Sequence, residues 1–188
     1  MTTIPIKELS LNFVEDRAIY IYGSFDDSIL KYIMPEFSKI VAEEAKKKDG
    51  TVKINIDSGG GYVYVLKNML SMVEFAKIND VIVETNAFGI AYSCASILAA
   101  SGTKGHRYIG EHAEHLAHLG WASTGNVRND VELERTTARV TAHFNFVRAM
   151  YKKYANIKNL EKVIHDDMYF IRGKNIIKNG LADKFIGS

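Results

Sequence analysis

Residues 52–61 read VKINIDSGGG, and this stretch sets the expected architecture of the chain. Val52, Ile54 and Ile56 alternate with polar residues, which predicts a β-strand. Three glycines follow, and after them apolar residues recur at the spacing of one helix face: Val63, Leu66, Leu70 and Val73. A strand, a glycine-rich turn and a helix in this order indicate an α/β protein.

The same alternation continues on both sides of this stretch. Residues 18–22, AIYIY, predict a strand that a helix follows. Val81–Val83 predicts another strand, and residues 93–101, SCASILAAS, predict a buried helix of small residues. Short strands are also expected near Arg107–Ile109, near His115–His118 and in the C-terminal LADKFI. Since no Gly/Ser-rich linker interrupts the pattern, we expect a single domain.

The longest periodic stretch covers residues 128–156 and predicts one long helix. Its apolar and aromatic stripe has heptad-like spacing and consists of Leu133, Thr137, Val140, Phe144, Val147, Tyr151 and Tyr154. At about 1.5 Å per residue this helix approaches roughly 40 Å, which exceeds what a compact domain of this size needs. We therefore expect it to project from the domain and to pack against another subunit.

Composition excludes several classes of protein. The 188 residues carry a formal net charge of +2 and are 47% hydrophobic, as in an ordinary globular protein. Near-neutral charge argues against a nucleic-acid binder or a polybasic membrane anchor. Cys94 is the single cysteine, so neither an intrachain disulfide nor a cysteine-based zinc site can form. Without a visible signal peptide or membrane span, the expected location is cytoplasmic.

Two segments that each precede a predicted helix contain candidates for catalysis. Three consecutive glycines, Gly59–Gly61, allow backbone N–H groups to point into a cavity and to stabilise an oxyanion, although glycines also serve ordinary tight turns. Ser93 begins the small-residue helix, where the helix dipole favours a nucleophile, and a simple N-cap is the other interpretation. Ser96 and Ser101 are rival nucleophiles, but Ser96 is expected deeper in the apolar helix.

Histidines cluster after this helix, at His106, His112, His115 and His118. Their spacing does not match H-E-x-x-H, which argues against a metal site. One of them is a candidate general base for Ser93, and surface or interface histidines are the alternative. The acidic candidates that would orient such a base are Asp166, Asp167 and Asp183. The residues alone do not choose among these combinations, because a triad is defined by geometry.

Taken together, the motifs resemble those of the Clp protease proteolytic subunit. Residues 56–63, IDSGGGYV, are similar to its I-N-S-P-G-G-x-V segment. Residues 89–108, GIAYSCASILAASGTKGHRY, resemble its G-x-A-A-S-M-x-x-x-L-x-x-x-G-x-K-G-K-R-Y/F stretch, which contains the nucleophile. RAIYIYG at 17–23 and NGLADKFI at 179–186 resemble two further family segments. The resemblance therefore runs in order from about Arg17 to Ile186.

This resemblance implies roles for individual residues. Ser93 would be the nucleophile and His118 the general base, while the backbone N–H groups of Gly61 and Cys94 would form the oxyanion hole. Asp167 would be the third member of the triad, with Asp166 as the second choice. A gapless count back from Gly180 instead brings Met168 to that position, and a methionine could not orient the base.

The resemblance also implies an architecture and an assembly. The expected fold is an α/β, crotonase-like ββα superhelix with a projecting handle helix. Residues 1–16 would form a short, pore-lining N-terminal segment, residues 17–188 the peptidase domain, and residues 118–156 the handle. Such chains form heptameric rings, which stack as tetradecamers. An AAA+ Clp ATPase feeds them unfolded protein and uses the ATP, so no cofactor is expected in this chain.

The expected function is therefore that of a serine endopeptidase subunit, a hydrolase with a Ser-His-Asp triad inside a ring-shaped barrel. Three alternatives stay open. The chain could be a catalytically silent ring subunit, because residues around His118 depart from the family pattern. It could instead be a crotonase-type acyl-CoA enzyme, which needs no serine nucleophile, or an ATP-independent protease of phage assembly. Labelling of a serine separates the peptidases from the other two.

Overall fold

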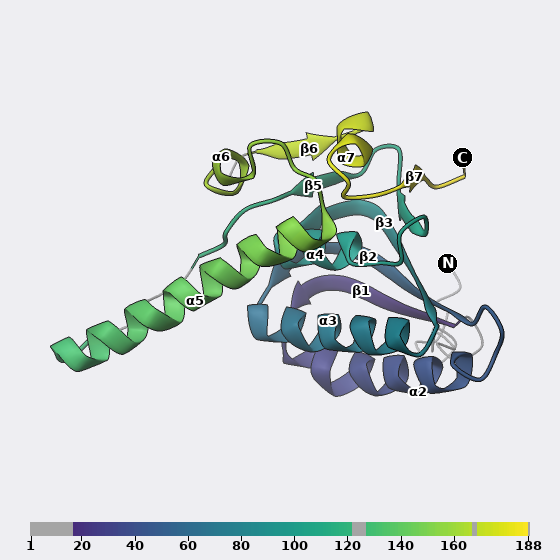
Figure 1. Ribbon diagram of the computed structural model, residues 1–188, viewed down its shortest axis with the longest axis horizontal. Helices are drawn as coiled ribbons and strands as arrows, with labels where there is room; N and C mark the ends of the chain where they lie inside the picture. Colours follow the sequence, from purple (N-terminus) through teal and green to yellow (C-terminus); the bar gives the residue numbers. More distant parts are fainter. Residues whose placement is uncertain (1–16, 122–126, 167–168, 188) are drawn as a thin grey trace, which may run out of the picture.

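A computed structural model describes residues 17–121, 127–166 and 169–187 (Figure 1). Its sheet has the strand order β1-β2-β3-β4-β7, and each neighbouring pair is parallel. The first three strands are long, and β4 and β7 are short. Their bounds are β1 Ala18–Phe25, β2 Thr51–Gly61, β3 Ile82–Tyr92, β4 Arg107–Ile109 and β7 Lys184–Phe185. As predicted, the C-terminal LADKFI provides an edge strand.

A second branch of the sheet starts from the far end of β3. Strand β5, Glu114–Leu116, pairs in parallel with residues 90–92 of β3, and β6, Phe170–Arg172, pairs antiparallel with β5. The near half of β3 pairs with β4 instead. The sheet therefore forks along β3, and the fork brings the chain that follows β5 to the end of β3.

Helices connect and cover the strands. A π-helical turn at Ile29–Ile33 leads into α2, and Pro35 lies in the first turn of that helix, where its missing N–H costs nothing. Figure 1 shows α2 and α3 side by side against the sheet, and α4 close to β2. The bounds are α2 Met34–Glu44, α3 Val63–Ile78, α4 Cys94–Ala100, α5 Asp130–Tyr154, α6 Leu160–Ile164 and α7 Lys174–Lys178.

The core lies between the long strands and these helices. Val52, Ile54 and Ile56 of β2 are fully buried, as their alternation predicts. On α3 the predicted face is buried at Leu66, Leu70 and Val73 but only half-buried at Val63. Each Å² of apolar surface that is buried in this core contributes about 25 cal/mol to the stability of the fold.

Three predicted boundaries were wrong, and each error bears on the site. Strand β2 runs on through the three glycines, because residues 60 and 61 pair with Ser24 and Phe25 of β1. Strand β3 extends from the predicted Val81–Val83 to Tyr92, since β2 on one side and β4 and β5 on the other supply hydrogen-bond partners. Strand β5 ends at Leu116, so His118 lies beyond the strand. In each case pairing with a neighbouring strand decides where the strand ends.

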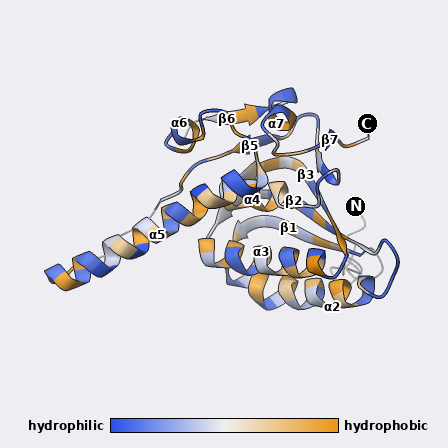
Figure 2. Cartoon of the chain, viewed as in Figure 1, coloured by the Kyte–Doolittle hydropathy of each residue, from blue (hydrophilic) through white to orange (hydrophobic). Residues whose placement is uncertain are grey.

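Helix α5 projects from the body of the domain, as predicted (Figure 1). Its first turn is capped by Asn129, whose Oδ1 accepts a hydrogen bond from the Glu132 N–H at 2.9 Å. Figure 2 shows hydrophilic and hydrophobic residues alternating along the projecting part. No helix in the described ranges is long and apolar enough to cross a membrane. The predicted pore-lining segment 1–16 lies outside the described residues.

Candidate active site

Ser93 occupies a strained backbone position between β3 and α4. Its φ and ψ are 56° and −122°, which a non-glycine residue rarely adopts. Its N–H donates to the Leu116 carbonyl at 2.8 Å, and its carbonyl accepts the first helical hydrogen bond, from Ile97 at 3.3 Å. Strain of about 1–3 kcal/mol persists only where the surroundings enforce it, and such positions cluster at active sites. The predicted place of Ser93 at a helix N-terminus is therefore confirmed.

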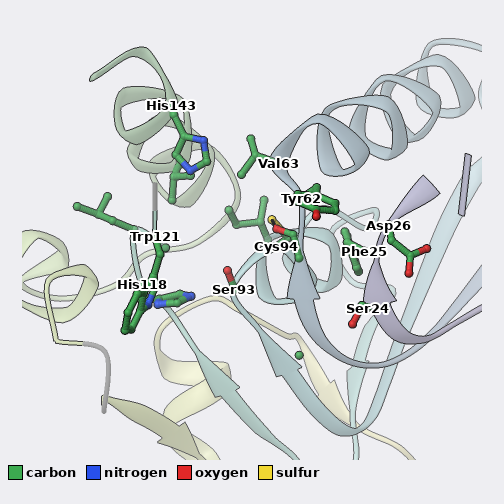
Figure 3. Close-up of a pocket in the computed structure, with 16 residues that line it drawn as sticks. Ser24, Phe25, Asp26, Tyr62, Val63, Ser93, Cys94, His118, Trp121 and His143 are labelled. Carbon is green, nitrogen blue, oxygen red and sulfur yellow. Dashed lines mark hydrogen bonds between the residues drawn. The ribbon is translucent and has the colours of Figure 1, made fainter. Parts of the chain in front are cut away.

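The side chain of Ser93 faces a cavity of about 570 Å³. In Figure 3 it lies between His118 and Trp121 on one side and Cys94, Phe25 and Tyr62 on the other. Ser93 and His118 are both half-buried, so each can reach a ligand in the cavity. The lining comprises Ser24, Phe25, Asp26, Gly59, Gly61, Tyr62, Val63, Ser93, Cys94, Ile97, His118, Leu119, Gly120, Trp121, His143 and Val147.

His118 reaches this cavity because of the fork in the sheet. Tyr92 pairs with Leu116, so the chain two residues beyond β5 runs alongside the start of α4. After His118, the Leu119 N–H donates to the Ile164 carbonyl at 2.9 Å, which attaches this segment to the end of α6. The structure thus brings together Ser93 and His118, which are 25 positions apart in the sequence.

The glycines of β2 form the wall beside Ser93. A Cβ on Gly60 would lie 2.9 Å from the Ser93 Cβ and 3.0 Å from the Cys94 nitrogen, so only glycine permits this approach. Gly61, with a φ of 150°, and Cys94 both line the cavity, and their role as an oxyanion hole stays a prediction. Two backbone N–H groups in such a wall could stabilise the negative charge of a tetrahedral intermediate.

The Cys94 thiol is not a rival nucleophile. It is 2% exposed, and its Sγ donates to the Gly61 carbonyl at 3.2 Å. Burial raises the pKa of this thiol to about 11, against smaller opposing effects from its hydrogen bonds. Because the thiolate is the reactive form, the thiol is inert near neutral pH. It instead links the glycine wall to the first turn of α4.

The rival serines do not line the cavity. Ser96 is fully buried, with its Oγ 2.9 Å from His115 Nδ1. Ser101 is also fully buried, and its hydroxyl donates to the Leu98 carbonyl at 2.7 Å. Among the described residues Ser24 also lines the cavity, but from the end of β1. Ser93 is therefore the serine with both the exposure and the backbone placement of a nucleophile.

The other three histidines of the predicted cluster occupy other environments. His115 is buried behind α4, and neither His106 nor His112 lines the cavity. Within the described ranges, no group of three or more His, Cys, Asp or Glu side chains is placed to hold a metal ion. Of the clustered histidines, His118 is the one that the structure brings to Ser93.

The three acidic residues that were candidates for orienting the general base lie in different parts of the structure. Asp183 forms an ion pair with Arg107 at 2.6 Å and accepts from the Gly105 N–H, so its role is structural. Asp166 is exposed in the loop after α6, the helix to which the His118 segment is attached. The predicted third member, Asp167, and the alternative Met168 lie outside the described residues.

Sequence reasoning missed several residues that line the cavity. His143 and Val147 come from α5, and Trp121, which is 83% exposed, stands at the rim. Burial, followed by the charge of Lys67, lowers the pKa of His143. The heptad stripe of α5 contains Val147 but gave no signal for His143, because only the packing angle of the helix turns that side chain toward Ser93.

Comparison with known proteins agrees with this fold. The family model of the Clp protease matches residues 6–188, so the chain belongs to the Clp protease family and has its α/β fold. The ATP-dependent Clp protease proteolytic subunit 2 of Chlamydia abortus is 25% identical over 183 residues, which cover 93% of this chain and 82% of that protein. The proteolytic subunit of Streptococcus mutans is 25% identical over 175 residues, or 92% and 86%.

The corresponding subunit of Leuconostoc citreum is 29% identical over 128 residues. This alignment covers 67% of the chain and spans 61% of the length of that relative. Membership of the family and the names of these relatives support a protease, a hydrolase of peptide bonds. The resemblance found in the sequence motifs is confirmed.

Proposed function

We propose that this protein is a serine endopeptidase subunit in which Ser93 is the nucleophile and His118 the general base. The observation that carries the proposal is the strained Ser93 at the N-terminus of α4, in one cavity with His118, Gly61 and Cys94. A histidine is well suited to accept a proton near neutral pH, and a serine beside it can then attack a carbonyl carbon.

The proposed reaction is an acyl transfer in two halves. His118 takes the proton from Ser93 as Oγ bonds to the peptide carbonyl carbon, and the N–H groups of Gly61 and Cys94 hold the oxyanion. The C–N bond then breaks, and His118 returns the proton to the leaving amine. Water hydrolyses the acyl-enzyme with His118 again acting as the base. Asp167 orients His118, with Asp166 as the second candidate.

Replacement of Ser93 by alanine tests the proposal most directly. We expect Ser93→Ala to abolish labelling by a fluorophosphonate and cleavage of a fluorogenic peptide, because the proposed covalent bond forms at the Ser93 Oγ. The matched control is Ser71→Ala, which removes an exposed hydroxyl from α3 and should leave both rates unchanged. Labelling followed by mass spectrometry of the modified peptide measures the effect.

The result can contradict the proposal in two ways. If Ser93→Ala is labelled at the wild-type rate, Ser93 is not the nucleophile. If the wild-type chain itself resists the reagent, the silent-subunit or acyl-CoA alternative is favoured, and a binding assay with an acyl-CoA separates these two.

The proposed assembly is a heptameric ring that stacks as a tetradecamer, receives unfolded protein from an AAA+ Clp ATPase, and works in the cytoplasm. Support comes from the projecting helix α5, where Val131 and Leu133 are 52% and 51% exposed. Exposed apolar residues on a protruding helix are suited to contact another subunit. The chemistry needs no cofactor in this chain, since the partner would hydrolyse the ATP. Light scattering of the purified protein, alone and with such an ATPase, tests the assembly.

A further inference from the structure

A row of buried polar groups lies behind Ser93 on the side away from the cavity. Ser96, His115 and Tyr151 are 0%, 0% and 1% exposed, and none of them lines the cavity. Their neighbours in the core are apolar. Burying polar groups costs free energy unless hydrogen bonds replace those made to water, so the partners of these three side chains define what the row does.

The hydrogen bonds of the row have one direction. Burial lowers the pKa of His115 to about 3, so its imidazole is neutral and carries a single N–H. Nε2 has no partner among the described residues, whereas Nδ1 lies 2.9 Å from Ser96 Oγ. Placing the hydrogen on Nδ1 avoids an orphaned buried donor, and His115 then donates to Ser96.

The row ends at the backbone of Ser93, the candidate nucleophile. Interaction with Ser96 opposes part of the rise in the pKa of Tyr151 that burial causes. Tyr151 in turn donates to the Ser93 carbonyl at 3.3 Å. The Ser93 N–H donates to the Leu116 carbonyl at 2.8 Å, which joins the same backbone to the end of β5, two residues before His118. Burial raises the pKa of Tyr151, so its hydroxyl keeps the proton that it donates.

We propose that Tyr151 is a positioning residue whose hydroxyl, which donates to the Ser93 carbonyl, holds the backbone of Ser93 in a fixed placement relative to His118. The inference rests on the proposed roles of Ser93 and His118 as nucleophile and base. Ser93 has a backbone conformation that needs outside support, and Tyr151 supplies it from a helix 58 positions further along the chain. Because Tyr151 belongs to α5, the placement of that helix is coupled to the geometry of the site.

The test compares two identical substitutions on the same helix. Tyr151→Phe removes the hydroxyl from the row, and Tyr154→Phe removes a half-buried hydroxyl that donates to Glu74 at 2.7 Å. We expect Tyr151→Phe to slow fluorophosphonate labelling of Ser93 at least about tenfold, because misplacement by about 1 Å can cost about 100-fold in rate. Tyr154→Phe should remain within about twofold of the wild type.

A second measurement does not depend on catalysis. Hydrogen exchange read by mass spectrometry should show faster exchange in peptides that span residues 93–97 and 116–119 in Tyr151→Phe, but not in Tyr154→Phe. Peptides from β1 and α3 should be unchanged in both variants, which separates local release from general unfolding. For the peptidase reaction, kcat should fall while KM for a short peptide stays the same, since the substrate-lining residues are intact.

The outcomes separate the two proposals. If the wild type is labelled and Tyr151→Phe matches it in both labelling and exchange, the positioning role is wrong and the proposed function stands. If the wild type is not labelled, the proposed function fails. The exchange measurement then decides whether Tyr151 still anchors this backbone. Ser96→Ala provides a second variant. A smaller loss of labelling rate is expected, because this change leaves the Tyr151 hydroxyl in place. Wild-type labelling rates and wild-type exchange in Tyr151→Phe and Ser96→Ala would overturn the inference.

Discussion

Helices α4 and α5 both line the candidate active site, but they are stabilised in opposite ways. All seven residues of α4 are buried, whereas only Val147 and Tyr151 are buried among the 25 residues of α5. A helix surrounded by core is held by packing, while a projecting helix depends on capping, ion pairs and whatever covers its exposed face. Ser93 directly precedes the buried helix, and the projecting helix places His143 in the cavity and Tyr151 behind Ser93.

Shortening a buried side chain of α4 should have the largest effect on the stability of the fold. Leu98→Ala removes a fully buried side chain from the center of the core and leaves a cavity. We expect a loss of about 2–5 kcal/mol in the free energy of unfolding, measured by urea denaturation. The same change at the exposed Leu133 of α5 is the control. Equal losses at the two positions would contradict the contrast between the helices.

Acidification should weaken the connection between the ends of the two helices. Arg107 donates to the carbonyls of Ala100 in α4 and Tyr154 in α5, at 3.1 and 2.9 Å. Asp183 holds Arg107 in place. Burial alone would raise the pKa of Asp183, but the hydrogen bonds and charge of Arg107 lower it overall.

A carboxyl group whose pKa is lowered by folding stabilises the fold above its unfolded pKa, which is about 3.9 for aspartate. This stabilisation disappears as the pH falls through the lower pKa of the folded state. We therefore expect Asp183→Asn to be less stable than the wild type at pH 7 and to approach it below about pH 4. Urea denaturation from pH 7 to pH 2 measures this, and a constant difference between the two proteins would contradict it.

The smallest effect on the isolated fold is expected at the tip of α5. Leu133→Glu replaces an exposed side chain, so the free energy of unfolding of a dilute sample should change by less than about 0.5 kcal/mol. If α5 packs against another subunit, the same change places a charge in that interface and reduces the size of the assembly. Light scattering checks this, and an assembly of unchanged size would show that Leu133 is not in an interface.

Much of the fold could be predicted because its signals are local. The alternation in β2, the small-residue helix α4, and the length and projection of α5 follow from short patterns in the chain. The ends of β2, β3 and β5 could not be predicted in this way, since they depend on pairing between strands. Gly60 shows the limit: its type indicates a turn, but its position within β2 beside Ser93 comes from the pairing with β1.

The candidate site was predictable in part for the same reason. Ser93 could be placed at a helix N-terminus from its own neighbours, and the roles of His118, Gly61 and Cys94 came from the resemblance to a family. Residue patterns alone could not choose His118 from four histidines, because the fork of the sheet along β3 makes that choice. His143 and Trp121 gave no local signal at all.

The sequence by itself determined the order and type of the main elements and the residues with suitable chemistry, because helix and strand periodicity and residue type are properties of short segments. Only the tertiary structure decided which of those residues meet. Ser93 and His118 approach each other through strand pairing, and Tyr151 reaches the Ser93 carbonyl from a helix that follows much later in the chain. Such contacts depend on how distant segments pack, and no short stretch of sequence contains that information.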